Sequence, residues 1–208
     1  MMLGYNPDRD VLDLAGKVFL ITSSTYIATP QSYHHQQTSL LGTAGLGKST
    51  VVQLARHNPK HIYFTERNTW AAEAVIAEAI PASTNVSFVP CDLDSLSFVS
   101  QAANSFLQKS GNQLDVLICN AGLMAVPPGI PKDGYEIQFA VNNLAHALLM
   151  MLCLPALQKT VHEKGDPRII SLTSLGFRSV FKAGIMFKDL KSSQENLRTL
   201  YVRVQPRT

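Results

Sequence analysis

Cysteine is scarce in this sequence. Its three cysteines are Cys91, Cys119 and Cys153, and no two of them form a C-x-x-C pair. So few thiols, odd in number, argue against a secreted disulfide scaffold and favour a reducing compartment. Long hydrophobic runs are also lacking: the first 17 residues contain no apolar core of the signal-peptide type, and the longest apolar stretch is residues 147–157. A bilayer-spanning helix takes about 20 apolar residues, so we expect a cytoplasmic protein without a membrane segment.

An excess of charge of one sign is equally lacking. Lys and Arg number 18, Asp and Glu number 15, and the formal net charge of +3 is spread along the chain without a basic run. This pattern gives no support for binding to nucleic acid or to an anionic membrane. The pair His34-His35 has no third ligand nearby, so we expect no metal site. The 208 residues, 46% of them hydrophobic, suffice for a single domain, 1–208, with a substantial core.

Short apolar runs alternate with helical patterns along the chain. The predicted strands are residues 17–22, 61–65, 85–90, 114–120 and 168–172, and the predicted helices are residues 49–57, 70–80, 96–109 and 134–157. Strands that are apolar throughout and are separated by helices indicate a parallel sheet covered on both faces. We therefore predict an α/β fold with a doubly wound parallel sheet.

Residues 23–41 do not fit this alternation. They have neither a helical nor a strand period and are rich in Ser, Thr, Gln and His. A loop from a strand to a helix in such units usually has about 2–6 residues, so this segment is an anomalous insert.

A glycine cluster follows the insert, Gly42-Thr-Ala-Gly-Leu-Gly-Lys-Ser49. It matches the P-loop pattern G-x-x-x-x-G-K-[ST], in which Lys48 would reach phosphate oxygens and Ser49 would bind magnesium. It matches equally well the turn of a dinucleotide-binding unit, in which glycines let the backbone approach a pyrophosphate. A surface loop that only caps a helix is a third interpretation. The candidate contact residues are Gly42, Gly45, Leu46, Gly47 and Lys48.

The later strands weaken the P-loop interpretation. A P-loop enzyme needs an acidic residue at the end of a later apolar strand to hold the metal, but these strands end in Asn120 and in Thr173-Ser174. Asp92 is acidic, but it follows Pro90, which makes a poor strand end.

Six short motifs occur along the chain, and their order and spacing are informative. They are Gly42-Thr-Ala-Gly-Leu-Gly47, Thr65-Glu-Arg-Asn68, Cys91-Asp-Leu93, Cys119-Asn-Ala-Gly122, Asn142-Asn-Leu-Ala-His146 and Thr173-Ser-Leu-Gly176. In this order and spacing, the chain resembles the short-chain dehydrogenases/reductases, in particular fungal members of the retinol-dehydrogenase-like type, over residues 12–196 apart from the insert. The resemblance implies a Rossmann-like fold and a nicotinamide cofactor.

Carried over to this chain, the resemblance implies cofactor contacts. Gly45 and Gly47 would line the pyrophosphate turn, and Arg67 would contact the 2′-phosphate, which favours NADP over NAD. A guanidinium pairs bidentately with a phosphate, although the neighbouring Glu66 weakens this choice slightly. The alternative is that Arg67 is a plain solvated charge. Asp92 resembles the residue that contacts the adenine, or else it caps the next helix.

The resemblance also implies residues at the end of the fourth strand and in the chemistry. Asn120, Ala121 and Gly122 would face the cofactor, unless they form a simple strand-end turn. Ser174 would bond the substrate carbonyl, or else it is only a turn serine. Asn142 would hold a water in a proton relay, although a buried Asn on an apolar helix can equally be structural. His146 is expected to be a hydrogen-bonded core residue.

The chain departs from the family's catalytic pattern, a Tyr with a Lys four residues later. Tyr201 alone follows Ser174, and four residues on stands Gln205. General acid–base groups typically contribute about 10²–10⁴-fold, so we expect little turnover and regard the fold as incomplete at its C-terminus. We hypothesise that residues 23–41 are translated intron and that a second gene-model error altered the end. A transcript containing both segments as printed would refute this.

By lineage, then, we expect an NADP-dependent oxidoreductase that interconverts an alcohol and a ketone or aldehyde, with a role in fungal secondary metabolism as a further hypothesis. Its partner would be a small-molecule carbonyl or alcohol substrate, and residues 134–157 resemble the helix through which family members form homodimers. The alternatives are a non-catalytic remnant that binds nucleotide or a partner, and a P-loop nucleotide hydrolase that uses Gly42–Ser49.

Overall fold

The computed structural model describes residues 4–23, 45–79, 84–123, 126–173, 185 and 187–194. The strands are β1 (Val18–Thr22), β2 (His61–Glu66), β3 (Val86–Pro90), β4 (Val116–Cys119) and β5 (Arg168–Ser171). The helices are α1 (Pro7–Asp10), α2 (Leu46–Ala55), α3 (Thr69–Ala79), α4 (Leu96–Ser110), α5 (Ile137–Phe139) and α6 (Ala145–Lys164). A π-helical turn, η3 (Ala140–Leu144), joins α5 to α6, and η5 (Phe187–Asp189) is a 3-10 turn.

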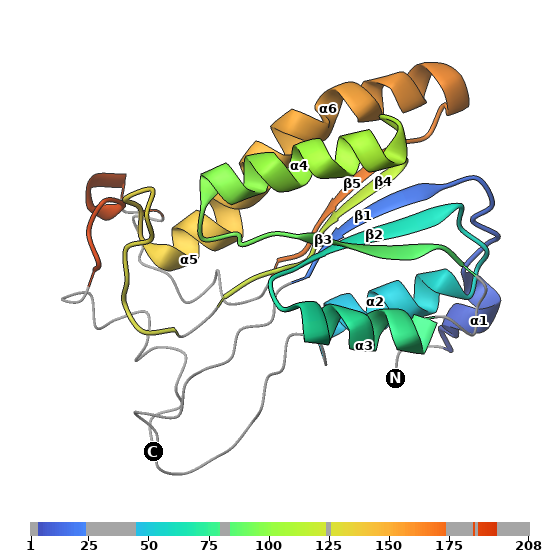
Figure 1. Ribbon diagram of the computed structural model, residues 1–208, viewed down its shortest axis with the longest axis horizontal. Coiled ribbons are helices and arrows are strands. Elements are labelled where there is room, and N and C mark those ends of the chain that lie inside the picture. The colour runs from blue at the N-terminus through green and yellow to red at the C-terminus, as the bar shows by residue number, and fades with distance from the viewer. Residues whose placement is uncertain are drawn as a thin grey trace, which may run out of the picture.

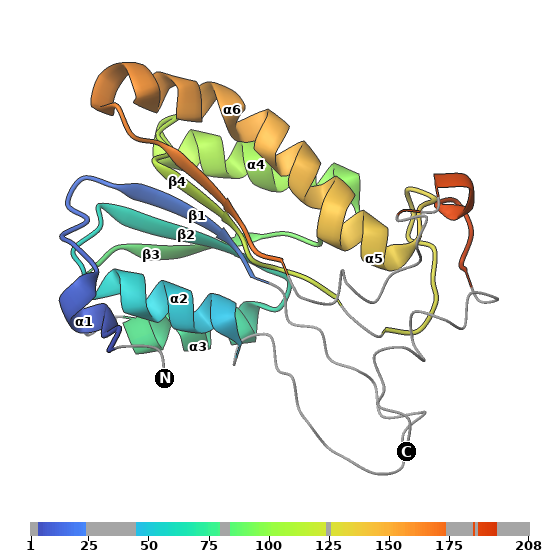
Figure 2. The same ribbon diagram turned by 180° about the vertical axis from the view of Figure 1, so that it is seen from behind.

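The five strands form one parallel sheet in the order β3-β2-β1-β4-β5. The strand order reverses between β1 and β4, the neighbours at the middle of this order. Helices α2 and α3 cover one face of the sheet, and α4 and α6 cover the other (Figures 1 and 2). The prediction of a doubly wound parallel sheet is confirmed.

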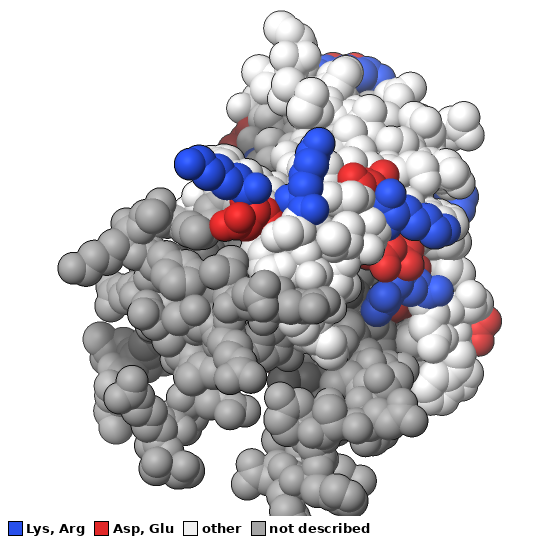
Figure 3. All heavy atoms as spheres, turned by 90° about the vertical axis from the view of Figure 1, so that its left-hand side faces the viewer, with Lys and Arg blue, Asp and Glu red and all other residues white. Residues whose placement is uncertain are grey.

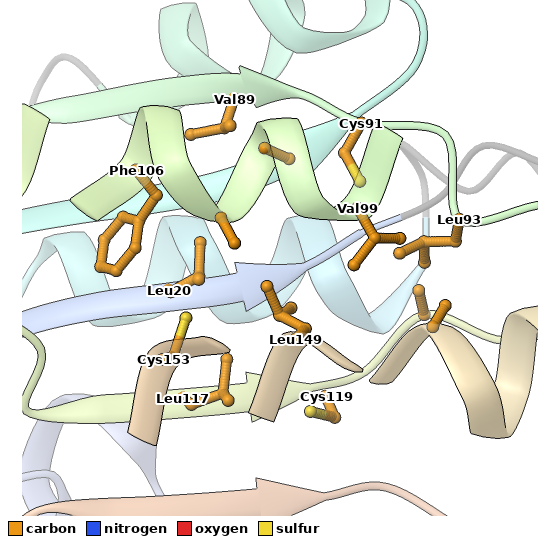
Figure 4. Close-up of a cluster of buried hydrophobic side chains, with 14 of the residues drawn as sticks. Leu20, Val89, Cys91, Leu93, Val99, Phe106, Leu117, Cys119, Leu149 and Cys153 are labelled. Carbon is orange, nitrogen blue, oxygen red and sulfur yellow. The ribbon is translucent and has the colours of Figure 1, made fainter. Parts of the chain in front are cut away.

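Each face of the sheet has its own core. Phe19 and Ile21 of β1 point into the core under α2 and α3, whereas Leu20 between them points into the core under α4 and α6. Figure 4 shows the second core, where Leu20 and Leu117 of the sheet meet Phe106 of α4 and Leu149 of α6. Burial on both faces explains why these strands are apolar at every position.

Several boundaries differ from the predicted ones. The long helix continues to Lys164, seven residues beyond its predicted end, and stops at Gly165, whose φ is +86°. The apolar pattern ends earlier because the last two turns lie at the surface, apart from Thr160, which is 2% exposed. At the other end of the chain, the short helix α1 was not predicted, although Asn6 before Pro7 is a helix-start signal.

Strand β5 lies at the edge of the described sheet, and all four of its residues are exposed. Ile169 and Ile170 are 44% and 43% exposed, so this strand is not covered on both faces as its apolar sequence predicts.

The helical stretch Ile137–Glu163 is long and apolar enough to cross a bilayer by length and composition alone. In the structure, its residues Leu149, Cys153, Ala156 and Leu157 are buried in the core with α4 and the sheet. This packing accounts for much of the apolar composition of the helix.

Candidate functional site

The candidate site lies where β1 and β4 end side by side. In an open α/β sheet, ligands bind outside the carboxyl ends of the strands, at the point where the strand order reverses. Here the buried hydroxyl of Thr22, at the end of β1, accepts the backbone N–H groups of Asn120 and Ala121 at 2.9 and 3.0 Å. The side-chain amide of Asn120 also donates to Thr22, from Nδ2 to the backbone carbonyl at 3.1 Å. These bonds fix the turn that follows β4.

A histidine from the helical layer joins this junction. His146 is 6% exposed, and its Nε2 lies 2.9 Å from Thr22 Oγ1. Its Nδ1 lies 3.1 Å from the carbonyl oxygen of Asn142. Burial lowers the pKa of His146, only partly offset by the bond to Asn142. His146 is thus a hydrogen-bonded core residue, as predicted.

Asn142 lies in the π-helical turn η3, a type of irregularity that often occurs at functional sites. Its side-chain amide pairs with one backbone position: Leu123 N–H donates to Oδ1 at 2.7 Å, and Nδ2 donates to the Leu123 carbonyl at 2.8 Å. The expectation that Asn142 is buried is wrong, because the residue is exposed and the bonds to Leu123 satisfy its amide. Asn142 therefore clamps the segment that follows β4 onto the helix.

The glycine turn enters α2 directly, so this helix starts at Leu46, three residues earlier than predicted. Gly45 is its N-cap and supplies no side-chain hydrogen bond, and Leu46 is 72% exposed. Gly47 is buried, and a Cβ atom there would lie 2.7 Å from Asn120 Nδ2 and 2.9 Å from Ser23 Oγ. Glycine is needed here because α2 packs closely against the β4 turn. Gly42 lies outside the described residues.

Lys48 has a partner within the helical layer. Its ammonium lies 2.6 Å from Glu78 of α3, and the two side chains are 28% and 51% exposed. In a P-loop this lysine would reach phosphate oxygens. Here the geometry gives it a role in joining α2 to α3.

The ends of β2 and β3 form a second part of the site. Arg67 Nη1 lies 3.7 Å from Asp92 Oδ1, with both side chains 35% exposed. Glu66 is only 1% exposed, and its carboxylate accepts the backbone N–H groups of Arg67 and Asn68 at 2.8 and 3.2 Å. Glu66 thus points inward while Arg67 lines a pocket. The lining residues are Arg67, Cys91, Asp92, Leu93, Asp94, Leu123, Ile137 and Val141.

Asp92 does not cap the next helix. Its Oδ1 accepts from Asp94 N–H at 3.4 Å, while the N-cap of α4 is Ser95. The first N–H group of that helix, at Leu96, donates to Asp133 Oδ2 at 2.7 Å, across 37 residues of sequence. Burial, and next the negative charge of Asp92, raise the pKa of Asp94. Two carboxylates and one guanidinium therefore meet at this pocket.

Residues 190–191, near the end of the described chain, pack beside the start of α5, whose Ile137 lines the pocket. The Glu136 N–H donates to the Leu190 carbonyl at 2.8 Å, and Lys191 Nζ lies 5.6 Å from the centre of the Tyr135 ring.

Figure 3 looks at the edge of the molecule where the strands end, and over its described part acidic and basic side chains alternate. Ser174 lies outside the described residues.

Sequence reasoning missed three structural roles: the hydrogen bonds of Thr22 to the turn after β4, the inward orientation of Glu66, and the bond from the start of α4 to Asp133. A Thr that ends an apolar strand carries no signal of its own. The contacts of Thr22 with Asn120 and His146 span 98 and 124 residues, so they exist only in the folded chain.

Comparison with known proteins agrees with this geometry. The sequence model of the short chain dehydrogenases matches residues 41–186. An uncharacterized oxidoreductase of Schizosaccharomyces pombe is 34% identical over 88% of this chain and 49% of its own length. The short-chain dehydrogenase/reductase drtF of Aspergillus calidoustus is 35% identical over 85% of this chain and 52% of its own. A solved structure, of an uncharacterized protein from Mycobacterium paratuberculosis, matches with a TM-score of 0.65 and 28% identity over 88% of this chain and 55% of that one.

This chain spans about half the length of the curated relatives it matches. The matched residues include the glycine turn, strands β2 to β5 and helices α2 to α6. The chain belongs to the short-chain dehydrogenase/reductase family.

Proposed function

We propose that this chain is the nucleotide-binding part of an NADP-dependent oxidoreductase that interconverts an alcohol and a ketone or aldehyde. The family uses nicotinamide cofactors. The observation that carries the choice of NADP is the arrangement of Glu66 and Arg67 at the end of β2.

The Glu66 carboxylate is occupied by the two backbone N–H groups of its own turn and is 1% exposed. An acidic residue that faced the ribose would hydrogen-bond the 2′-hydroxyl of NAD and repel a 2′-phosphate. With Glu66 turned inward, Arg67 is the charged group of this turn that lines the pocket. A guanidinium suits a phosphate because it can donate two parallel hydrogen bonds, and in this proposal the phosphate displaces Asp92 from Arg67.

The pyrophosphate of the cofactor also fits the residues present. Helix α2 has ten residues, and its N-cap residue, Gly45, has no side chain that could cap the first turn. Unpaired N–H groups and the positive end of the helix dipole make such a turn an anion site. Gly47 brings this turn against Asn120, so the first turn of α2 and the turn after β4 lie side by side.

When bound, the nicotinamide would supply or accept the hydride. The residues of this chain would hold the cofactor. Thr22 and Asn142 fix the turn at residues 120–123, which in this proposal lies against the nucleotide. Ser174 would hydrogen-bond the substrate oxygen. Because Gln205 stands where a Lys would follow Tyr201, we propose that the 208 residues as printed bind nucleotide but turn over slowly.

We also propose a homodimer through α6. On its outer face, Met151, Leu154 and Val161 are 71%, 44% and 50% exposed. These positions follow helical spacing, so they lie on one face of the helix together with the exposed Gln158, and a second copy can cover this face.

Thermal unfolding with added nucleotide tests the proposed function. A ligand present at 100 times its Kd stabilises the folded state by about 2.7 kcal/mol, and for a domain of this size each kcal/mol shifts the Tm by about 2–4 °C. We expect NADPH to raise the Tm, NADH to raise it less, and ATP with magnesium to leave it unchanged. A shift with ATP and magnesium alone would instead indicate a P-loop hydrolase, and no shift with any nucleotide would refute nucleotide binding.

A further inference from the structure

His146 takes part in a closed set of hydrogen bonds at the junction of β1, β4 and η3. Its Nδ1 faces the Asn142 carbonyl at 3.1 Å, and its Nε2 faces the Thr22 hydroxyl at 2.9 Å. A carbonyl oxygen only accepts, so Nδ1 must carry a proton. In a neutral imidazole, Nε2 is then left with a lone pair and can only accept.

The Thr22 hydroxyl completes the set. It has one proton and two lone pairs. The N–H groups of Asn120 and Ala121 donate to both lone pairs, at 2.9 and 3.0 Å. The hydroxyl proton therefore points to Nε2 of His146, and every donor in the junction meets one acceptor.

We propose that His146 is a positioning residue for nucleotide binding: in its neutral Nδ1–H form it accepts the Thr22 proton and so aims the lone pairs of that hydroxyl at the turn after β4. The proposal rests on the proposed function, because it assumes that this turn lies against the nucleotide. A protonated Nε2 would place a donor opposite an oxygen whose lone pairs are already used. The hydroxyl would then have to give up one of its bonds to the turn.

A displacement of this turn would reach both walls of the site. On one side, Asn120 Nδ2 lies 2.7 Å from where a Cβ of Gly47 would be, so the turn touches the first turn of α2. On the other side, Asn142 clamps Leu123 through two hydrogen bonds.

The surroundings of His146 keep it neutral. In the part of the chain that the structure describes, the imidazole makes no ion pair, and its hydrogen-bond partners are the Thr22 hydroxyl from β1 and the Asn142 carbonyl from η3. The titratable group of β4 nearest in sequence to the turn is the Cys119 thiol, whose pKa burial raises to about 11. Burial lowers the pKa of His146 itself.

A double-mutant cycle tests the proposal on the full 208-residue chain, with the Kd for NADPH as the readout. His146→Phe keeps a ring but removes the acceptor, and Thr22→Val removes the hydroxyl. Each change should weaken binding by about tenfold, the effect of leaving a buried polar group unpaired. The double variant should be no weaker than Thr22→Val alone, because both changes break the same bond. Equal losses from His146→Phe in both backgrounds would show that His146 only fills space and would overturn the proposal.

His146→Gln is the matched control, because its side-chain oxygen can still accept from Thr22 but does not titrate in this range. We expect it to bind NADPH within about threefold of the unmodified chain. Because burial lowers the pKa of His146, the unmodified chain should keep its affinity at the ordinary histidine pKa of about 6.5 and lose it at lower pH, whereas His146→Gln should not lose it. Parallel pH profiles would overturn the proposal.

Nitrogen-15 NMR of the imidazole needs no variant. We expect a protonated Nδ1 and an unprotonated Nε2 at pH 7, and the opposite tautomer or an imidazolium would contradict the proposal. If NADPH does not bind the unmodified chain, the proposed function fails. The same cycle read by Tm, together with the NMR signature, then still decides whether His146 and Thr22 act as one unit.

Discussion

Replacing Gly47 by Ala probes the contact between α2 and the turn after β4. The new Cβ would lie 2.7 Å from Asn120 Nδ2, 2.9 Å from Ser23 Oγ and 3.3 Å from Ser23 Cβ. The Asn120 amide is held because it donates to the Thr22 carbonyl. The Ser23 Cβ is held because the Ser23 backbone exchanges hydrogen bonds with the Thr65 hydroxyl at 3.2 Å, whereas the Ser23 Oγ can rotate away.

Overpacking of this kind costs about 1–3 kcal/mol. Ala in a helix recovers about 1 kcal/mol relative to Gly, so the net loss should be about 0–2 kcal/mol. At about 2–4 °C per kcal/mol, the Tm should fall by up to about 8 °C. Urea unfolding gives the free energy directly, and nucleotide affinity should fall too because Asn120 is displaced.

Gly129→Ala is the matched control, because its Cβ would have neighbours no closer than 3.9 Å. That variant should unfold within about 0.5 kcal/mol of the parent. In the variant Gly47→Ala/Asn120→Ala the clash with the amide disappears, so part of the lost stability should return. If Gly47→Ala alone stabilises the protein by about 1 kcal/mol, as at an open helical position, the packing argument is wrong.

Three further predictions follow. Arg67→Gln should weaken NADPH binding by about 10–100-fold in calorimetry, as expected for a lost charge-assisted hydrogen bond, and leave NADH binding unchanged; equal losses for both would remove the basis for NADP. Burial raises the pKa of Cys119 to about 11 and of Cys91 and Cys153 to about 12, so a thiol reagent at pH 8 should label none of them until the protein unfolds; rapid labelling of the native protein would contradict their burial. Burial lowers the pKa of His61 and His146, so below pH 6.5 the unfolded chain binds more protons than the folded chain. The free energy of unfolding should therefore fall as the pH falls, less steeply in His146→Gln. A slope unchanged in that variant would refute the contribution of His146.

The sheet could be predicted from sequence because burial on both faces leaves a continuous apolar run. This holds for β1, where Phe19, Leu20 and Ile21 all lie in a core. The run alone does not say where a strand sits in the sheet. Ile169 and Ile170 of β5 look like the residues of β1 in sequence, yet they are exposed at the edge.

Element ends depended on tertiary contacts. Helix α6 continues through a polar stretch to Gly165, where the apolar period no longer helps. The start of α4 is satisfied by Asp133, a residue of a distant loop, rather than by the nearby Asp92 that local capping rules favoured.

At the site, motif order found Arg67 and Asp92, which the structure brings to 3.7 Å. The roles of these two residues toward a nucleotide stay predictions. The inward turn of Glu66 keeps a third carboxylate out of the lining of this pocket, and it depends on backbone N–H groups that no sequence pattern displays. From the sequence alone, the neighbouring Glu66 weakened the choice of NADP slightly.

Calorimetric titration of the 208-residue chain with NADPH and with NADH tests the central claim most directly. Because Arg67 lines the pocket and Glu66 is turned away from it, NADPH should bind at least about tenfold more tightly than NADH. Equal affinities would contradict the assignment of the 2′-phosphate to Arg67, and the absence of heat with either nucleotide would contradict the nucleotide-binding function itself.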